Sequence, residues 1–169
     1  MGDHLIDIVD ENDVVIGTAT KHDAQKKGLR HRVARVSLED SYGNILLQKR
    51  RYDKELYPDC WDLAASGHLE CGEAYLAAAK RELYEELGVV ADLMEVKYYQ
   101  TSGQTGWRRL NRSNKLYKGV IPAETTFCLQ ADEVAEVRWV TVAELRKLLK
   151  NHPGEIADGL QEVYEIMYT

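Results

Sequence analysis

Apolar and polar residues alternate along the first 50 positions in a way that predicts two β-hairpins. Alternation with a period of two places one face of a strand in the core, and small or polar turn residues between two such runs indicate a hairpin. The turns are expected at residues 10–13 and 41–44, with Gly43 as the flexible position of the second. The strands that they join are expected at residues 5–9 and 14–18, and at residues 32–38 and 45–49.

The rest of the chain mixes further strands with three helical segments. Residues 73–87 are rich in Ala and Leu and are followed by Gly88, a residue type that commonly ends helices. Thr141 is a suitable N-cap for a helix over residues 141–149. Pro153 opens a third helix, whose apolar stripe is Ile156, Leu160, Val163 and Met167. Strands are expected around residues 93–99, 116–121 and 137–140. This order indicates an α/β (α+β) fold with a mixed sheet between helices.

One stretch, residues 67–89, carries a spaced set of glycines, glutamates and an arginine. It reads GHLECGEAYLAAAKRELYEELGV and fits the pattern G-x5-E-x7-R-E-U-x-E-E-x-G-U, in which U is aliphatic. Seven of these positions require one residue type, so a chance match has a probability on the order of 10⁻⁸ per start position. A solvated helix face with an Arg81–Glu85 pair is the alternative explanation, but it leaves Gly67 and Glu73 unexplained.

The helix in this stretch predicts a cluster of carboxylates. At about 100° per residue, one stripe is expected to pack on the sheet and consists of Leu76, Ala79, Leu83 and Leu87. Glu82, Glu85 and Glu86 share a neighbouring stripe, next to the small Ala78. Because bare carboxylates at close range repel one another, a divalent cation would stabilise the cluster.

Oxygen ligands favour Mg²⁺, with Mn²⁺ as the alternative. We expect Glu82 and Glu86 to bind the metal directly, and Glu85 to be either a third ligand or a base acting through water. Arg81 is expected to hold Glu85 or Glu73 in place. Gly67 is explained as part of a turn over residues 66–72 that directs a backbone carbonyl at the metal. The number of metal ions stays open.

The complete pattern resembles the signature of the Nudix hydrolases. This resemblance implies an α/β/α sandwich with a mixed central sheet, formed by residues 1–169 as a single domain, and metal-dependent cleavage of a diphosphate bond. In that family the general base often comes from a loop outside the signature. The candidates in this chain are Asp132, Glu133 and Glu136, with a plain polar loop as the equal alternative.

The amino-terminal half also resembles isopentenyl-diphosphate isomerase and the hydrolases grouped near it. The resemblance rests on DENDVVIGTATK and on the stretch from LRHRVARVSLED to DLAASGH. It implies that the diphosphate is held by Lys21, by Arg50 or Arg51, and by Lys54. His68, after the signature glycine, either lines the substrate cleft or is structural.

The chain departs from the isomerase pattern at the positions that matter for isomerisation. Ser66 stands where the isomerases have a catalytic cysteine, while Ala24 and Asn114 stand where they have a histidine and a glutamate that bind metal. The first hypothesis is therefore a Mg²⁺-dependent pyrophosphohydrolase acting on a nucleoside diphosphate derivative or another organic diphosphate. The alternatives are an isomerase-like enzyme and a non-catalytic sensor of a diphosphate or nucleotide.

Composition bears on the partners, the compartment and the cysteines of the protein. A net charge of −6 argues against nucleic-acid binding, and no apolar run approaches the about 20 residues that a membrane span needs. Cys60, Cys71 and Cys128 lack metal-ligand spacing and are expected to be free thiols in the cytoplasm. The expected partner is a small diphosphate substrate, and its identity and the oligomeric state stay open. Selectivity is expected to lie in loops at residues 99–114 and 130–136. In the first of them Trp107, with Arg108, Arg109 and Arg112, either stacks a base or grips a phosphate, or the segment is an ordinary exposed loop.

Overall fold

The computed structural model describes residues 4–169, which form a nine-stranded mixed sheet with helices on both faces. The strands are β1 (Leu5–Val9), β2 (Val15–Thr20), β3 (His31–Glu39), β4 (Ile45–Arg50), β5 (Trp61–Asp62), β6 (Ala65–His68), β7 (Met94–Thr105), β8 (Arg108–Val120) and β9 (Val134–Val140). The helices are α1 (Lys21–Lys27), α2 (Tyr75–Leu87), α3 (Val142–Asn151), the 3-10 turn η1 (Pro153–Glu155) and α4 (Asp158–Tyr168).

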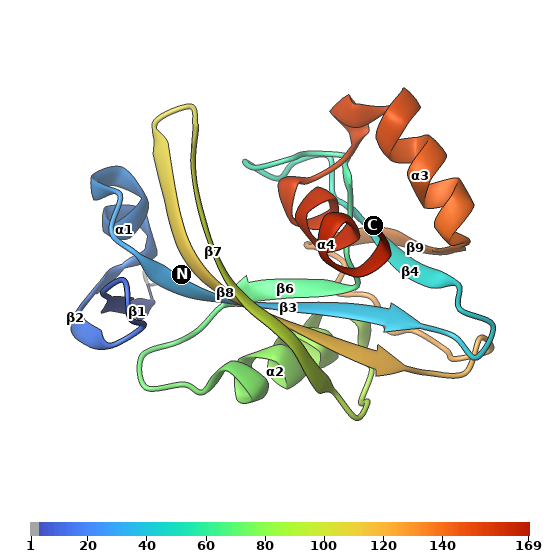
Figure 1. Cartoon of the computed structure of the whole chain (residues 1–169), viewed down its shortest axis with the longest axis horizontal. Coiled ribbons are helices and arrows are strands. Elements are labelled where there is room, and N and C mark those ends of the chain that lie inside the picture. The colour runs from blue at the N-terminus through green and yellow to red at the C-terminus, as the bar shows by residue number, and fades with distance from the viewer. Residues whose placement is uncertain (1–3) are drawn as a thin grey trace.

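Strand β3 organises the sheet, because it pairs with β8 in parallel and with β1 and β6 antiparallel. The two strands of the second predicted hairpin exist, but β3 and β4 meet only at the pair Glu39–Ile45. Strand β4 turns away to pair with β5 and β9. The sheet therefore opens between β3 and β4, which diverge in Figure 1, with β6 paired to β3 and β5 paired to β4.

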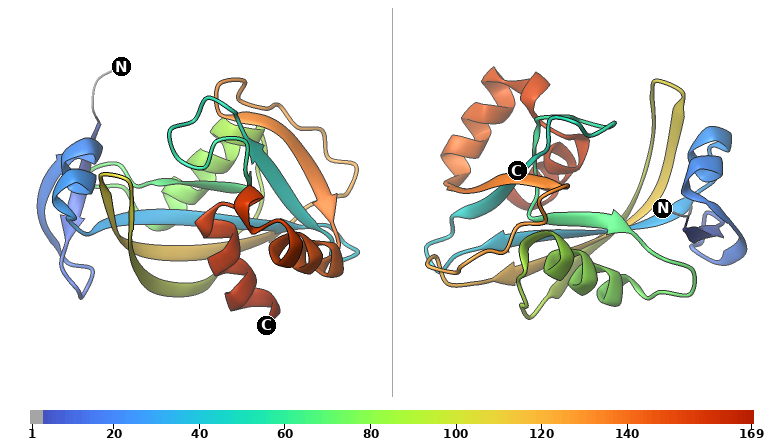
Figure 2. Two further views of the ribbon diagram at one scale, coloured as in Figure 1. Left: turned by 90° about the horizontal axis from the view of Figure 1, so that it is seen from above. Right: turned by 180° about the vertical axis from the view of Figure 1, so that it is seen from behind.

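The helices cover the two faces of the sheet with separate apolar cores, which confirms the predicted mixed sheet between helices (Figure 2). Helix α2 buries Ala78, Ala79, Leu83 and Leu87 against β3 and β6. Helices α3 and α4 bury residues such as Leu145, Leu160 and Val163 on the other face. No helix of residues 4–169 is long and apolar enough to span a membrane.

Several sequence predictions need correction. Helix α2 begins at Tyr75, so Glu73 lies before it, and Leu76 is 39% exposed because Tyr75 and Ala78 take its place in the core. Pro153 starts the short 3-10 turn η1, and α4 begins only at Asp158. Thr141 does cap α3, and its Oγ1 accepts a hydrogen bond from the backbone N–H of Glu144 at 3.1 Å in a capping box.

The hydrophobic pattern missed helix α1 and the short strands β5 and β6, and it missed the far half of the β7–β8 hairpin. Helix α1 is short, has a Thr20 N-cap, and ends at Gly28 in a left-handed conformation. The expected loop at residues 99–114 is the far half of the long β7–β8 hairpin, which extends beyond the sheet beside α1 (Figure 1). Much of β7 is exposed, so polar residues occupy both of its faces and the alternation of apolar and polar residues that would indicate a strand is absent.

Candidate active site

Helix α2 gathers the signature carboxylates around one guanidinium group. Arg81 donates to both oxygens of Glu73, from Nε at 2.8 Å and from Nη2 at 2.9 Å. Its Nη1 lies 2.7 Å from Glu82 Oε1 and 3.3 Å from Glu85 Oε2, and its Nη2 reaches the His68 carbonyl oxygen at 3.2 Å. Hydrogen bonds to Glu73 are the main reason that the pKa of Arg81 is raised. The fork of Arg81 thus ties the loop before α2 to the helix, as its expected positioning role requires.

Glycine at position 67 is required by close packing and not by turn geometry. Gly67 lies in strand β6, opposite Ala34 of β3, which corrects the predicted turn over residues 66–72. A β-carbon built on Gly67 would lie 2.1 Å from both Cδ and Oε1 of Glu82. The Glu82 carboxylate therefore rests directly on the β6 backbone. The turn itself uses Gly72, whose φ is 76°.

Glu86 is the most deeply buried carboxylate of the cluster, with 8% of its surface exposed. Its Oε2 accepts a hydrogen bond from Gln48 Nε2 of β4, and Gln48 also donates to the Ala64 carbonyl at 3.0 Å. Burial is the first cause, and the negative charge of Glu82 the second, that raise the pKa of Glu86 well above its ordinary value. Asp62 and Glu133 add further negative potential at this position.

A divalent cation fits this donor set, because its charge would offset the repulsion between Glu82 and the buried Glu86. Burial also raises the pKa of Glu82, although Arg81 acts in the opposite direction. Among residues 4–169, no three His, Cys, Asp or Glu side chains are already arranged so that they could hold a metal ion together. Glu82 and Glu86 are the pair that would hold the metal, and Glu85, whose side chain is 50% exposed, stands at the rim.

The predicted diphosphate-binding cations do not all face the same way. Lys21, Arg50 and Arg112 are close enough to influence one another, since partial desolvation and then the charge of Lys54 lower the pKa of Lys21, with smaller contributions from Arg112 and Arg50. Arg50 also lies 3.6 Å from Asp62 Oδ2. Arg51 is turned away, because it pairs with Asp53 and donates to the Ala131 carbonyl at 2.6 Å. Arg50 is therefore the arginine that faces the opening.

Glu133 is the one outside carboxylate candidate, among the described residues, that lies at this opening. Its Oε2 is 2.6 Å from Lys54 Nζ, and its charge acts on both Lys21 and Glu86. Asp132 and Glu136 are exposed, and Glu136 lies in β9 opposite Lys49. The Lys54–Glu133 pair thus connects the carboxylate end of the opening to its cationic end.

Sequence reasoning missed three buried polar residues in the same region, Arg35, Gln48 and Asp62. Arg35 donates to Asn114 Oδ1 at 3.1 Å, and its Nη2 lies 3.3 Å from Glu162 of α4. Gln48 and Asp62 interrupt apolar strand sequences, and that interruption was the available signal. Arg112 was expected in a loop beside Trp107, whereas it lies buried in strand β8.

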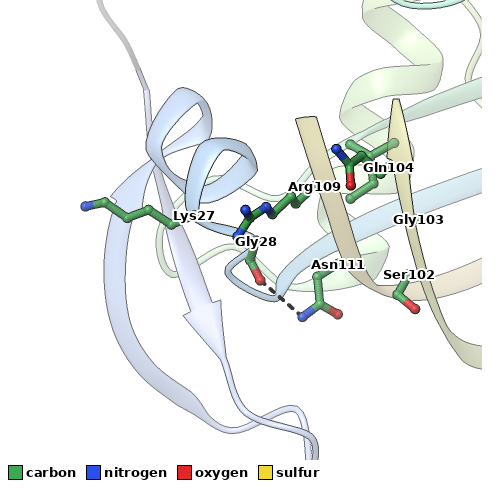
Figure 3. Close-up of a pocket in the computed structure, with 8 residues that line it drawn as sticks. Lys27, Gly28, Ser102, Gly103, Gln104, Arg109 and Asn111 are labelled. Atoms are coloured by element: carbon green, nitrogen blue, oxygen red, sulfur yellow. Dashed lines mark hydrogen bonds between the residues drawn. The ribbon is translucent and has the colours of Figure 1, made fainter. Parts of the chain in front are cut away.

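A separate groove lies between α1 and the β7–β8 hairpin (Figure 3). Its lining residues are Lys27, Gly28, Ser102, Gly103, Gln104, Arg109, Leu110 and Asn111. The lining contains no carboxylate and none of the signature residues. This groove is therefore distinct from the candidate active site, although β8 contributes to both.

Comparison with known proteins places these features in one family. The sequence matches the NUDIX domain family over residues 29–161. It is 34% identical to isopentenyl-diphosphate Delta-isomerase 2 of Photorhabdus laumondii over 152 residues, which cover 89% of this chain and 85% of that protein. It is 33% identical to an uncharacterized Nudix hydrolase of Pseudomonas aeruginosa over 138 residues, or 80% of this chain and 78% of the other. A crystal structure from Deinococcus radiodurans shares the fold, with a TM-score of 0.80 and 23% identity over 98% of this chain and 99% of that one.

Proposed function

The chain belongs to the Nudix family, as its signature predicted, and on that premise we propose that it is a Mg²⁺-dependent pyrophosphohydrolase. The substrate class is a nucleoside diphosphate derivative or another organic diphosphate. One observation carries the proposal: Glu86 is buried beside Glu82, with its pKa raised by burial and by that neighbour, at an opening whose other end is cationic. Such a site binds a metal and a polyanion together.

Glu82 and Glu86 would hold the metal, which supplies Lewis-acid stabilisation of the phosphoryl oxygens and lowers the pKa of a bound water. Arg81 keeps Glu73, Glu82 and Glu85 in fixed positions. Lys21, Arg50 and Lys54 neutralise charge on the diphosphate. Glu85 or Glu133 takes a proton from the attacking water as its oxygen bonds to phosphorus. The bond from that phosphorus to the bridging oxygen breaks, and the second phosphate group leaves with the bridging oxygen.

Isomerisation of an isoprenoid diphosphate is the second candidate, because a relative named as such an isomerase is 34% identical over 89% of this chain. The residues at the sheet opening do not favour it. Ser66 stands beside Gly67 in place of a thiol, and Asn114 is engaged by Arg35. Cationic Arg112 lies beside His31 in the sheet, where it would repel a divalent cation.

The test is phosphate release from a panel of nucleoside and isoprenoid diphosphates with Mg²⁺ or Mn²⁺, in the presence of an auxiliary pyrophosphatase and phosphatase. Wild-type protein is compared with Glu86→Gln and with the matched control Glu165→Gln, an exposed helical glutamate. We expect metal-dependent turnover in wild type and control and a loss of at least about 10²-fold in Glu86→Gln. NMR of the same reactions detects isomerised diphosphate. Isomerisation without hydrolysis, or tight binding of a panel compound without turnover of any, would overturn the proposal in favour of an isomerase or a sensor.

A further inference from the structure

Three polar side chains, two of them buried and one partly buried, form a row across neighbouring strands on the face of the sheet that α4 covers. His31 of β3 is paired in register with Arg112 of β8, and Val33, two residues after His31, is paired with His68 of β6. The rings of His31 and His68 stack, with centroids 5.0 Å apart and an interplanar angle of 22°. We call His68, His31 and Arg112 the histidine–arginine row.

The row contains polar atoms whose hydrogen-bonding capacity is not used by residues 4–169. These atoms are Nε2 of His31, Nε2 of His68 and Nε of Arg112. His31 is 0% exposed and Arg112 only 7% exposed. A buried polar group without a partner typically costs about 1–3 kcal/mol, so three at one place indicate that a ligand completes them.

The available donors and acceptors define the chemistry of that ligand. His31 Nδ1 lies 2.9 Å from the Leu29 carbonyl oxygen, to which it donates, so Nε2 of the neutral ring is an acceptor. Arg112 Nε–H can only donate, and it has no acceptor within the described chain. His68 Nε2 serves as either, according to its tautomer. A ligand with several acceptor oxygens and one hydroxyl satisfies all three.

The electrostatic potential of the row is positive. Burial is the first cause that lowers the pKa of His68, followed by the charges of Lys21, His31, Arg112 and Arg35. The pKa of His31 is lowered to about 4 first by burial and then by cations that include Arg112 and Lys21. Asp158 lies 3.2 Å from Arg112 Nη1, but on the side away from the free Nε. A divalent cation is disfavoured here, whereas an anion is attracted.

We propose that the histidine–arginine row binds a phosphate group of the substrate, as its singly protonated anion. This proposal rests on the proposed function and adds a second subsite to it. His68 connects the two, because its backbone carbonyl oxygen accepts a hydrogen bond from Arg81 Nη2 at 3.2 Å, and Arg81 Nη1 also donates to Glu82. The metal end then holds the phosphoryl group that is attacked, and the row holds the other phosphate. It follows that the substrate is an organic diphosphate with an unesterified terminal phosphate.

The test uses inorganic phosphate as the probe and the full chain in EDTA, so that metal binding and turnover play no part. Calorimetry measures the affinity of wild type, of Arg112→Met and of the control Arg109→Met, which alters an exposed arginine of the same strand. We expect a weakening of at least 10-fold in Arg112→Met and wild-type affinity in Arg109→Met. The ring ¹⁵N signals of His31 and His68 are expected to shift on phosphate addition in the wild type.

Lys21→Met provides a second variant in case Arg112→Met does not fold, because Lys21 is at the surface and acts on the row only by charge. It should also weaken phosphate binding. The proposal is overturned if phosphate does not bind, or if it binds equally to wild type and to the folded variants of Arg112 or Lys21. Arg112-dependent phosphate binding together with no hydrolysis of any diphosphate would instead refute the proposed hydrolase and leave the phosphate subsite standing.

Discussion

The carboxylate of Glu82 lies so close to the backbone of Gly67 that a β-carbon on Gly67 would be 2.1 Å from its Cδ and Oε1. One residue lies in strand β6 and the other in helix α2, so this contact fixes the distance between them. Of the neighbouring pair Glu82 and Glu86, the first accepts a hydrogen bond from Arg81 and the second from Gln48. The position of the carboxylates thus depends on a residue with no side chain.

Replacing Gly67 by alanine is expected to displace Glu82 and to lower kcat by about 10²-fold, because misplacing a catalytic group by about 1 Å costs that much. Metal affinity should fall as well. The matched control is Gly17→Ala, since a β-carbon there meets no atom of the described chain within 4 Å. Steady-state kinetics with circular dichroism separates loss of activity from loss of fold. Unchanged kinetics in a folded Gly67→Ala protein would show that Glu82 does not need its present position.

Changing Arg81 to lysine keeps the positive charge but removes the fork that contacts Glu73, Glu82 and Glu85 together. We expect kcat to fall by about 10–100-fold, with a smaller change in KM, because the residue positions ligands and does not touch substrate. Lys80→Met, on the exposed face of the same helix, should have wild-type kinetics. A change confined to KM would indicate instead that Arg81 binds the substrate.

Mg²⁺ is expected to stabilise the wild-type protein against heat. At about 100 times its Kd, a bound ion adds about 2.7 kcal/mol, which corresponds to a rise in Tm of roughly 5–10 °C for a chain of this size. Glu86→Gln should lose most of this rise, and its metal-free form should be more stable than metal-free wild type, because a buried charge is gone. Differential scanning fluorimetry measures both effects. An equal rise in Tm for both proteins would remove Glu86 from the metal site.

Glu85 and Glu133 compete for the role of general base, and the structure favours Glu85. The carboxylate of Glu133 is engaged by Lys54 at 2.6 Å, whereas Glu85 stands at the exposed rim of the cluster, 3.3 Å from Arg81. We therefore expect Glu85→Gln to lower kcat by about 10²–10⁴-fold while the Mg²⁺-induced rise in Tm remains. Glu133→Gln should have the smaller effect on kcat. The reverse order, measured in single-turnover kinetics, would assign the proton transfer to Glu133.

Stability should fall as the pH is lowered from 7 to 5, in part because of His31. Burial lowers its pKa to about 4, below the ordinary value of 6.5, so the unfolded chain binds the proton more tightly. The stability that this group contributes is therefore complete above pH 6.5 and is lost as the pH falls toward 4, by on the order of 2 kcal/mol between pH 7 and 5. Urea unfolding of His31→Gln should show a shallower loss, while His152→Gln, whose side chain is 56% exposed, should match wild type. Equal slopes for His31→Gln and wild type would contradict the buried, neutral state of His31.

The sequence by itself determined the features that depend on neighbours along the chain. The cap at Thr141, the amphipathic stripe of α4 and the three glutamates of α2 follow from helical geometry within a few residues. The contact of Arg81 with Glu85 spans four residues and could be anticipated for the same reason. The resemblance of residues 67–89 to the Nudix signature also lies within one local stretch, and the family match confirms what it implied.

Only the tertiary structure decided which distant residues meet. Period-two patterns show that a strand exists but not its partner, so nothing local predicted that His31 would lie beside Arg112, 81 positions later in parallel register. For the same reason the contact of Gln48 with Glu86 could not be predicted. Gly67 was predicted to be a turn residue, whereas it is required by the close approach of Glu82. The physical reason is that helix formation is governed by contacts three and four residues apart, whereas strand pairing and the opening between β3 and β4 are selected by how the whole core packs.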